Sequence, residues 1–286
     1  MVGMVILNYN DYKTVKHLYD IVKNYKSIAH IVIVDNCSDD GSYEELESTC
    51  ECTVLRTKKN GGYSYGNNYG IRWLENNCPC EYYIVSNPDV EFDEAFVKKI
   101  VNYMEIDKRI GIMSGVMLER NGQPAKSQFG VTTGYWKAVL ECLYIYRRYQ
   151  MHYAKHQVDK KKMVNFVQVV WGSLFIISAC AYRKIDGFDE NTFLYHEENI
   201  ISERIKNSGY KEAILTNVSY IHMHAVTISK ATSRMKRHKL GMESQYYFQC
   251  HYHNLSKAKR LILKSMIRFS IAELAIINRV LSIFGK

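Results

Sequence analysis

The chain has 286 residues, enough for one large domain or for one domain with an appendage. Hydrophobic residues make up 47% of it, so it can bury a substantial core, which excludes a disordered chain. The net charge of +9 suits an anionic partner such as a nucleic acid, a phosphorylated substrate or an acidic lipid. Composition alone does not choose among these partners.

The eight cysteines do not suggest disulfides, because a chain this long needs no disulfide framework and it opens directly into the apolar run 4–8. We therefore expect reduced thiols and a cytoplasmic protein. Two C-x-C pairs, Cys50 with Cys52 and Cys78 with Cys80, raise the question of a zinc site. Each pair precedes a different predicted strand. In the usual order of nucleotide-binding sheets those strands lie about 14 Å apart, too far for four sulfurs around one metal ion.

The first hundred residues alternate between apolar strands and amphipathic helices. We expect strands at 4–8, 31–34, 53–55 and 82–85, and helices at 12–25, at 43–48, through Trp73 and Leu74, and at 93–104. Strands that are apolar on both faces indicate a mostly parallel sheet covered by helices on both sides. The pattern predicts an α/β, Rossmann-like nucleotide-binding fold whose ligand lies at the carboxyl ends of the strands.

Polar side chains gather at these predicted strand ends. Asn8 and Asn10 follow the first strand, Asp35 ends the second, and Asn87 and Asp89 follow the fourth. A lone carboxylate at such a place is often only a helix cap. Several polar positions on one rim of the sheet instead favour a binding site.

A Gly/Asn-rich segment at 60–68 precedes the helix through Trp73, and we expect it to be a loop. It matches neither the dinucleotide-binding pattern G-x-G-x-x-G nor a P-loop with its lysine. Glycine backbone beside asparagine side chains can still approach a diphosphate closely. Asn60, Gly62 and Asn67 are therefore candidate donor-binding residues.

Two adjacent acids, Glu197 and Glu198, follow a turn at Gly187 and an aromatic run. They open an expected helix that ends at Gly209. Neighbouring carboxylates raise each other's pKa, so one of them could accept a proton near neutral pH. The alternative is an ordinary helix N-terminus with two acids in its first turn.

The middle of the chain is mixed. Short strands are expected near 110–118 and 163–170, and Trp171, Gly172 and Ser173 come at the end of the second. Between them, 136–156 is rich in Tyr and Arg, which suits a nucleic acid, a sugar or a membrane headgroup. A later strand at 218–224 would present His222 and His224 on one face, which favours a metal-ligand hypothesis.

The C-terminal 50 residues have a helical pattern, and we expect a helical region at 231–286 after a catalytic domain at 1–230. On a helical wheel Lys257, Arg260, Lys264, Arg268 and Arg279 share one side, and Ile262, Met266, Phe269, Ile276, Ile277, Val280 and Phe284 lie opposite, interrupted by Lys259 and Glu273. No uncharged run approaches the length of a membrane-spanning helix. The helix could lie on an anionic membrane or pack on its own domain.

The motifs occur in an order that resembles a known family. They are Asn8-Tyr9-Asn10, Val34-Asp35-Asn36 with Ser38 and 40–42, Asn60 through Asn68, 87–90, Gly172-Ser173, 187–190, and Glu197-Glu198 with Arg204. This set, over about residues 3–255, resembles the family-2 inverting glycosyltransferases of GT-A fold, particularly the rhamnosyltransferase-like branch. The resemblance implies a nucleotide-sugar-binding half at 1–105 and an acceptor or catalytic half at 106–230.

The resemblance also implies residue roles. The donor-binding set would be Asn8, Asn10, Asp35, Asn60, Gly62, Asn67, Asn87 and Asp89, with Asp35 contacting the pyrimidine base. Asp89 resembles the last aspartate of a metal-binding D-x-D motif in which Asn87 replaces the first. Glu198 is similar to the general base and Glu197 to its partner. His222, or else His224, would help to hold Mg²⁺ or Mn²⁺, and Trp171, Gly172 and Ser173 would lie on the acceptor side.

The implied function is inverting transfer from a nucleoside-diphosphate sugar, either dTDP-rhamnose or a UDP-hexose. The acceptor would be a glycan or a polyprenyl-diphosphate-linked sugar for capsule or cell-wall polysaccharide, at the inner face of the plasma membrane. One alternative is a non-catalytic sugar-nucleotide or glycan-binding protein, suggested by Asn87 and by Ile200, which stands where many members of the family have a further acid. Another is a nucleic-acid-binding protein. Against that alternative, the chain contains no recognised nucleic-acid module, so we expect no nucleic-acid partner.

Overall fold

The computed structural model describes residues 1–153, 155–223 and 233–283. A single nine-stranded sheet organises the chain, with strand order β3-β2-β1-β4-β8-β6-β9-β5 and β7 paired to β9. The strands are β1 (Val2–Asn8), β2 (His30–Asp35), β3 (Thr53–Arg56), β4 (Tyr82–Ser86), β5 (Val90–Glu91), β6 (Ile110–Glu119), β7 (Val164–Val167), β8 (Leu174–Ser178) and β9 (Lys211–His222).

The helices alternate with these strands in the first half of the chain and dominate its end. They are α1 (Tyr12–Val22), α2 (Ser42–Thr49), α3 (Gly62–Asn77), α4 (Glu94–Ile106), α5 (Tyr135–Glu141), α6 (Tyr144–Tyr153), α7 (Ala179–Lys184), α8 (Glu197–Asn207), α10 (Arg234–Tyr252) and α11 (Lys257–Ile283).

The predicted parallel half is confirmed. β1 pairs in parallel with both β2 and β4, and β2 pairs in parallel with β3. Beyond β4 the antiparallel strand β8 is inserted, followed by β6 and β9, which run in the same direction as β4. Only β5, β7 and β8 among the described strands run the other way, so the sheet is mostly parallel, as expected for the α/β class.

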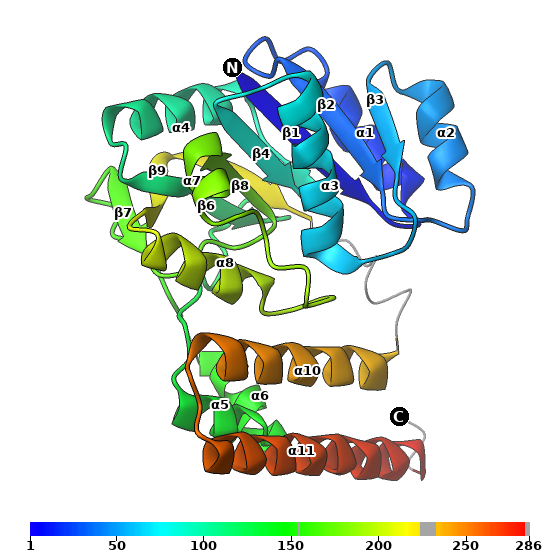
Figure 1. Cartoon of the computed structure of the whole chain (residues 1–286), viewed down its shortest axis with the longest axis vertical. Coiled ribbons are helices and arrows are strands. Elements are labelled where there is room, and N and C mark those ends of the chain that lie inside the picture. The colour runs from blue at the N-terminus through cyan, green and yellow to red at the C-terminus, as the bar shows by residue number, and fades with distance from the viewer. Residues whose placement is uncertain (154, 224–232, 284–286) are drawn as a thin grey trace.

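Helices cover the sheet on both faces (Figure 1). α1, α2 and α4 bury their apolar sides, including Leu18 and Phe96, against one face. α3, α7 and α8 bury theirs, including Ile71 and Ile201, against the other. Strands apolar on both faces thus find partners on both sides, which is why β1, β2 and β4 show no alternation of buried and exposed residues.

The predicted separation of the two C-x-C pairs is confirmed. Cys50 and Cys52 precede β3, whereas Cys78 and Cys80 precede β4, and β2 and β1 separate these two strands. All eight cysteines are free thiols.

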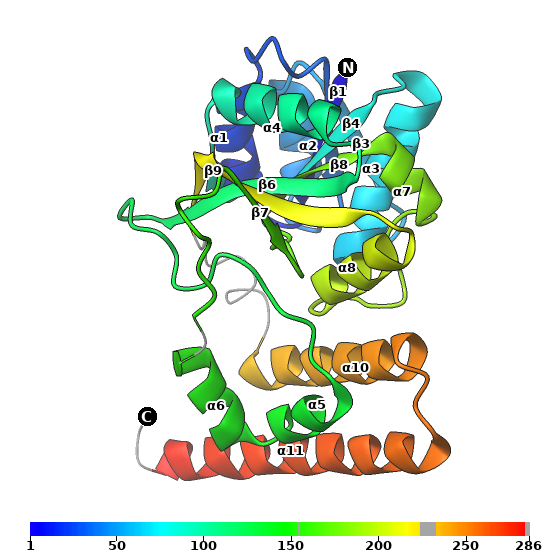
Figure 2. The same ribbon diagram turned by 90° about the vertical axis from the view of Figure 1, so that its left-hand side faces the viewer.

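Four helices form a separate layer beside the α/β domain: α5, α6, α10 and α11, referred to below as the helical layer (Figures 1 and 2). Its core contains Tyr135, Cys142, Met242, Leu263 and Ile267. In both views α10 lies between α11 and the sheet. The sequence placed 135–153 in the catalytic half, but these residues pack with the C-terminal helices, which supply the apolar surface that two short helices lack.

Three local expectations were wrong. The loop expected at 60–68 ends at Gly61, because α3 begins at Gly62 and includes Asn67. The late strand begins at Lys211 rather than at 218. The sequence did not indicate the earlier start, because Glu212 is buried in this strand despite its charge. Residues 171–173 do not end a strand: β7 stops at Val167, and they lead into β8.

Candidate active site

The carboxyl ends of β1 and β2 form the first part of the site. Asn8 and Asp35 are register partners in the sheet, and both side chains are fully buried. Asn8 Nδ2 donates to Asp35 Oδ2 at 2.7 Å, and the Ser38 amide donates to Asp35 Oδ1 at 2.9 Å. Asn10 lies further out and exchanges hydrogen bonds with Asp39. Asp35 therefore orders the turn after β2, and its contact with a nucleotide base stays a prediction.

The turn after β2 is tied directly to the start of α3. Asn36 Nδ2 donates to Asn60 Oδ1 and to the Gly62 carbonyl, each at 3.0 Å. Gly62 has a φ of +86°, and a Cβ there would lie 2.1 Å from the Phe193 carbonyl oxygen. This position therefore requires glycine both for its backbone angle and for its close approach to the 193–196 segment. The sequence did not predict that Asn36 makes this connection.

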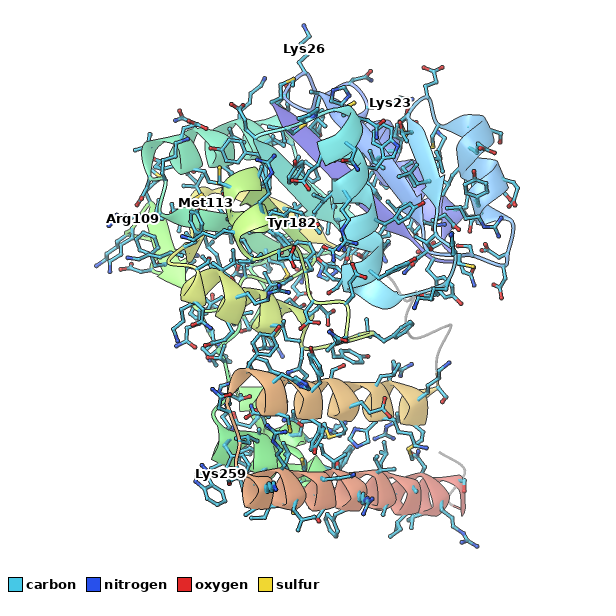
Figure 3. The ribbon with its side chains drawn as sticks, viewed as in Figure 1. Lys23, Lys26, Arg109, Met113, Tyr182 and Lys259 are labelled. Carbon is cyan, nitrogen blue, oxygen red and sulfur yellow. The ribbon has the colours of Figure 1, made fainter. Side chains whose placement is uncertain are left out.

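Asn67 and Asn68 lie side by side in α3 but serve different purposes. Asn67 is fully buried, donates to the Tyr63 carbonyl of its own helix, and its Oδ1 accepts no hydrogen bond within the described residues. Asn68 accepts from the Phe188 amide and from the Tyr182 hydroxyl, both at 2.9 Å. Figure 3 shows Tyr182 in the interior of the α/β domain. Asn68 thereby fixes the segment that leads to the acid pair.

A second polar group forms where β5 meets β9. Val90 pairs with His222, so the preceding Asp89 comes within 3.3 Å of His222 Nε2 through its Oδ2. The sequence predicted these two residues as metal ligands, and the structure brings them together. His224 lies outside the described residues. One carboxylate oxygen and one imidazole nitrogen suit Mn²⁺ or Mg²⁺ as part of a larger ligand set. No cluster of three such side chains occurs within the described ranges.

This group connects to the acceptor-side residues through backbone and hydroxyl contacts. The Asn87 amide donates to the Ser173 carbonyl at 2.8 Å, and Ser173 Oγ lies 2.8 Å from the Tyr220 hydroxyl. Tyr220, on β9 two residues before His222, was not recognised from the sequence. Trp171 donates from its indole nitrogen to the Ser127 carbonyl at 3.1 Å, which holds the segment in place.

The acid pair opens α8 as expected, and an unusual backbone turn delivers it. Tyr195 and His196 have φ angles of +69° and +62°, a left-handed conformation that is uncommon for residues other than glycine. His196 is stacked on Phe248 of α10, and burial lowers its pKa to about 4, so it is neutral at neutral pH. Two successive residues of this kind cost roughly 1–3 kcal/mol each and often mark functional sites. Nothing in the local sequence predicts them.

Glu197 is more deeply buried than Glu198. Glu197 is buried, and its Oε2 accepts no hydrogen bond within the described residues. Glu198 is half-buried and accepts from the Gly172 amide at 3.4 Å. Burial raises the pKa of each carboxyl, and the charge of Glu198 raises that of Glu197 further. The sequence predicted the mutual effect, whereas the larger cause, burial, depends on the tertiary structure.

Gly172 lies between Glu198 and Tyr63. The Tyr63 hydroxyl donates to the Gly172 carbonyl at 2.7 Å. A Cβ at Gly172 would lie 3.1 Å from Glu198 Oε1 and 3.2 Å from the Tyr63 hydroxyl oxygen. The absence of a side chain thus lets the carboxylate approach the segment before β8. These contacts bring the predicted acceptor-side residues next to the predicted base.

Glu212 is a further buried acid near Glu198, missed from the sequence. Its Oε2 accepts from the Val170 amide at 2.5 Å, two residues before the amide that contacts Glu198. Burial raises its pKa to about 8, and the charge of Glu198 adds to the shift. A carboxyl with this pKa is mostly protonated at neutral pH. The signal in the sequence was an acid at the start of the apolar run 213–215.

The α/β domain and the helical layer meet at the segment that carries the base. The Tyr247 and Tyr252 hydroxyls of α10 both donate to Asp189 Oδ2, at 2.9 Å and 2.6 Å. Ser244 Oγ donates to the Leu194 carbonyl at 2.8 Å. Helix α10 therefore supports the 189–196 segment from outside the sheet.

Comparison with known proteins finds relatives that are named as sugar transferases. The low-salt glycan biosynthesis hexosyltransferase Agl10 of Haloferax volcanii is 24% identical over 285 residues, covering 96% of this chain and 81% of that protein. The N-acetylglucosaminyl-diphospho-decaprenol L-rhamnosyltransferase of Mycobacterium tuberculosis is 21% identical over 244 residues, covering 78% and 75% of the two chains. Both alignments extend past the parallel half of the sheet.

The fold has solved counterparts. The mannosyltransferase PcManGT of Pyrobaculum calidifontis, in complex with GDP-Man and Mn²⁺, superimposes with a TM-score of 0.59 at 13% identity, covering 96% of this chain and 74% of that one. At this identity the likeness concerns the GT-A fold alone. The family model for glycosyl transferase family 2 matches residues 4–174, more than half of the chain. The protein therefore belongs to glycosyl transferase family 2 and is a glycosyltransferase of GT-A fold.

Proposed function

We propose that this glycosyltransferase transfers a sugar from dTDP-rhamnose or a UDP-hexose to a glycan or polyprenyl-diphosphate-linked acceptor. The transfer would invert the configuration at the anomeric carbon. The names of its relatives support the substrate classes. One is a hexosyltransferase of glycan biosynthesis, and another transfers L-rhamnose to a sugar on diphospho-decaprenol. The process served would be capsule or cell-wall polysaccharide synthesis.

The observation that carries the proposal is the position of Glu198. It lies at the start of α8, half-buried, against the Gly172 amide. Burial raises its pKa from the ordinary glutamate value toward neutrality, which is where a general base works best. A carboxylate held by backbone amides still retains lone pairs for an incoming hydroxyl group.

The reaction would proceed as a single displacement. Glu198 takes the proton from the acceptor hydroxyl while the hydroxyl oxygen of the acceptor bonds to the anomeric carbon. The bond from that carbon to the diphosphate oxygen breaks, and its electron pair leaves with the nucleoside diphosphate. Attack from the face opposite the leaving group inverts the configuration. General-base assistance of this kind contributes about 10²–10⁴ in rate.

Asp89 and His222 would hold a divalent cation, Mg²⁺ or Mn²⁺. Their two donor atoms converge, and diphosphate oxygens and water would complete the coordination, as is usual for Mg²⁺ at phosphate sites. When bound, the ion neutralises charge on the departing diphosphate. Asn87 takes the place of a further carboxylate, so we expect the donor to supply more of the ligand set than in a site with two acids.

The donor pocket would extend from this pair to the ends of β1 and β2. Asp35, ordered by Asn8 and Ser38, would accept a hydrogen bond from the base. Asn10 and Asn60 lie in the turns before α1 and α3, and α3 itself contains Gly62 and the buried Asn67. These four residues would face the ribose or diphosphate. Within the described residues, Asn67 Oδ1 accepts no hydrogen bond, so it could accept one from the donor.

The proposed location is the cytoplasmic face of the plasma membrane, because a polyprenyl-linked acceptor is anchored there. Among the helices of the described residues, none has a stretch both long and apolar enough to cross a bilayer. A peripheral attachment would then bring the enzyme to its acceptor.

A donor screen tests the proposed function. Purified protein is incubated with dTDP- and UDP-sugars plus Mn²⁺, and released nucleoside diphosphate is measured with and without a polyprenyl-diphosphate-linked acceptor. We expect slow hydrolysis of one donor and a rate increase with the acceptor. The anomeric configuration of the product, read by NMR, decides between inversion and retention. Retention, or no turnover of any donor, would overturn the proposal.

A further inference from the structure

The net positive charge of the protein comes from the helical layer. Its helices α5, α6, α10 and α11 contain 13 Lys and Arg residues and three acids, a net charge of +10. The whole chain has 38 Lys and Arg and 29 Asp and Glu, so everything outside these helices has 25 and 26, a net charge of −1. The layer is therefore the part of the molecule that an anionic surface would attract.

Exposed apolar side chains gather on the same layer. Fifteen large hydrophobic residues are exposed in the described ranges, and nine of them belong to α5, α6 and α11. They include Trp136 and Ile145, at 66% and 76% exposure. These helices make up less than a quarter of the chain, so the concentration marks an interaction surface rather than the usual scatter of apolar residues.

Helix α11 buries a different side from the one the wheel singled out. Leu263, Ile267 and Leu274 are buried in the layer. The two charges that interrupted the expected apolar side have partners there. Glu273 accepts from the Tyr144 amide at 2.9 Å, and the Lys259 ammonium lies 5.2 Å from the centre of the Tyr135 ring. The alternative that the helix packs on its own chain is thus correct for this side.

A second apolar side of α11 stays exposed. Ile262, Phe269 and Ile276, spaced seven residues apart, are 43%, 53% and 64% exposed. At 100° per residue they lie roughly 140° around the helix from the buried side. Lys264 and Arg268, both exposed, lie on the remaining arc of the helix. An apolar row flanked by basic side chains is the arrangement of a helix that lies in a membrane interface.

We propose that the outer side of α11, with the exposed residues of α5 and α6, is the surface by which this protein binds an anionic lipid bilayer. Figures 1 and 2 show α11 on the outside of the layer, with α10 between it and the sheet, and Figure 3 shows Lys259 on this helix at the opposite end of the molecule from Lys26. The inference deepens the proposed function, because the bilayer is where a lipid-linked acceptor resides.

A second copy of the chain is the competing occupant. A seven-residue spacing also occurs at helix–helix seams. Pairing two copies through this row would, however, bring together two helical layers whose helices each have a net charge of +10. An anionic bilayer neutralises these charges, so the bilayer is favoured.

Vesicle co-sedimentation of the full chain tests the charge contribution. The probes are phosphatidylcholine vesicles with and without phosphatidylglycerol. We expect binding only to the anionic vesicles, weakened by salt. Lys264→Glu with Arg268→Glu should lower the partition constant more than about tenfold, since each basic residue near the surface is worth about fivefold. The matched control, Lys26→Glu with Lys99→Glu, changes the net charge by the same amount at exposed lysines outside the layer. Its partition constant should stay within about twofold of the wild-type value.

The apolar contribution has its own pair of variants. Phe269→Ser with Ile276→Ser should also lower binding about tenfold, whereas Phe166→Ser with Ile106→Ser, equally exposed positions elsewhere, should not. Equal losses in test and control pairs would overturn the proposal, as would an absence of binding to anionic vesicles. So would a dimer in sedimentation velocity that Phe269→Ser with Ile276→Ser dissociates. Donor hydrolysis by the same variants is read separately, so failure of the enzymatic proposal is distinguishable from failure of this one.

Discussion

The Gly172 amide and the Glu198 carboxylate face each other across 3.4 Å, and this contact fixes the predicted base against the segment before β8. No other residue type fits at 172 without displacing Glu198 or Tyr63, because an added Cβ would lie 3.1 Å from one and 3.2 Å from the other. The relationship joins two motifs that lie 26 residues apart in the chain.

Glu198→Gln is expected to lower kcat about 10²–10⁴-fold while leaving donor affinity nearly unchanged, because a general base acts on the acceptor. Wild-type activity should fall as pH drops below the raised pKa of Glu198, since protonation removes the base. Steady-state kinetics and donor titration measure both effects. More than about a tenth of wild-type kcat in the variant would move the role to Glu197 or elsewhere.

Gly172→Ala should reduce kcat about tenfold with little change in donor affinity, because the methyl group pushes the Glu198 carboxylate from its place. Gly134→Ala is the matched control, since a Cβ there has no heavy atom within 4 Å. Kinetics of the two variants under identical conditions make the comparison. Equal activities would show that the position of the carboxylate does not limit turnover.

Asp35→Ala should weaken binding of the nucleoside diphosphate by ~1–3 kcal/mol, because the hydrogen-bond acceptor for the base is removed. The structure adds a second expectation. Asn8 and the Ser38 amide lose their partner, so the free energy of unfolding should also fall. Calorimetric titration, corrected for the folded fraction from urea unfolding, separates the two. An unchanged dissociation constant would argue against contact with the base.

Removal of divalent metal by EDTA should abolish turnover and lower affinity for the nucleoside diphosphate, and added Mn²⁺ should restore both. His222→Ala should raise the Mn²⁺ concentration needed for half-restoration about tenfold or more, since loss of a ligand weakens the site. His17→Ala, which removes an exposed imidazole 2.9 Å from Glu91, is the control. Equal Mn²⁺ requirements in both variants would exclude His222 as a ligand.

Glu212→Gln tests the buried acid. Its pKa rises from 4.5 in a free side chain to about 8 in the folded protein, so the folded state holds the proton more tightly. Between these values the free energy of unfolding of the wild type must fall as pH rises. The variant should equal the wild type near pH 4 and be more stable by a few kcal/mol at pH 8. Urea unfolding at both pH values measures this, and a constant difference would contradict it.

Several elements could be read from the sequence because their signals are local. The runs 31–34 and 82–85 are apolar throughout, which is possible only for strands covered on both faces, and β2 and β4 are the result. The order of polar residues at strand ends placed Asn8 and Asp35 at one rim, since parallel strands end at the same edge. The acid pair opened a helix, as its position before an amphipathic pattern indicated.

Other features depended on contacts between distant segments. The start of α3 at Gly62 relies on the approach of Phe193, and the left-handed His196 is stacked against Phe248 on α10. Burial, which decides the pKa of Glu198 and Glu212, depends on tertiary packing, in which both residues contact amides of the segment before β8. The sequence by itself determined the alternating strands and helices of the first hundred residues, because periodicity is a property of neighbouring residues. Tertiary structure alone decided which side of α11 is buried, since that helix has two apolar sides and only packing against α5, α6 and α10 selects one.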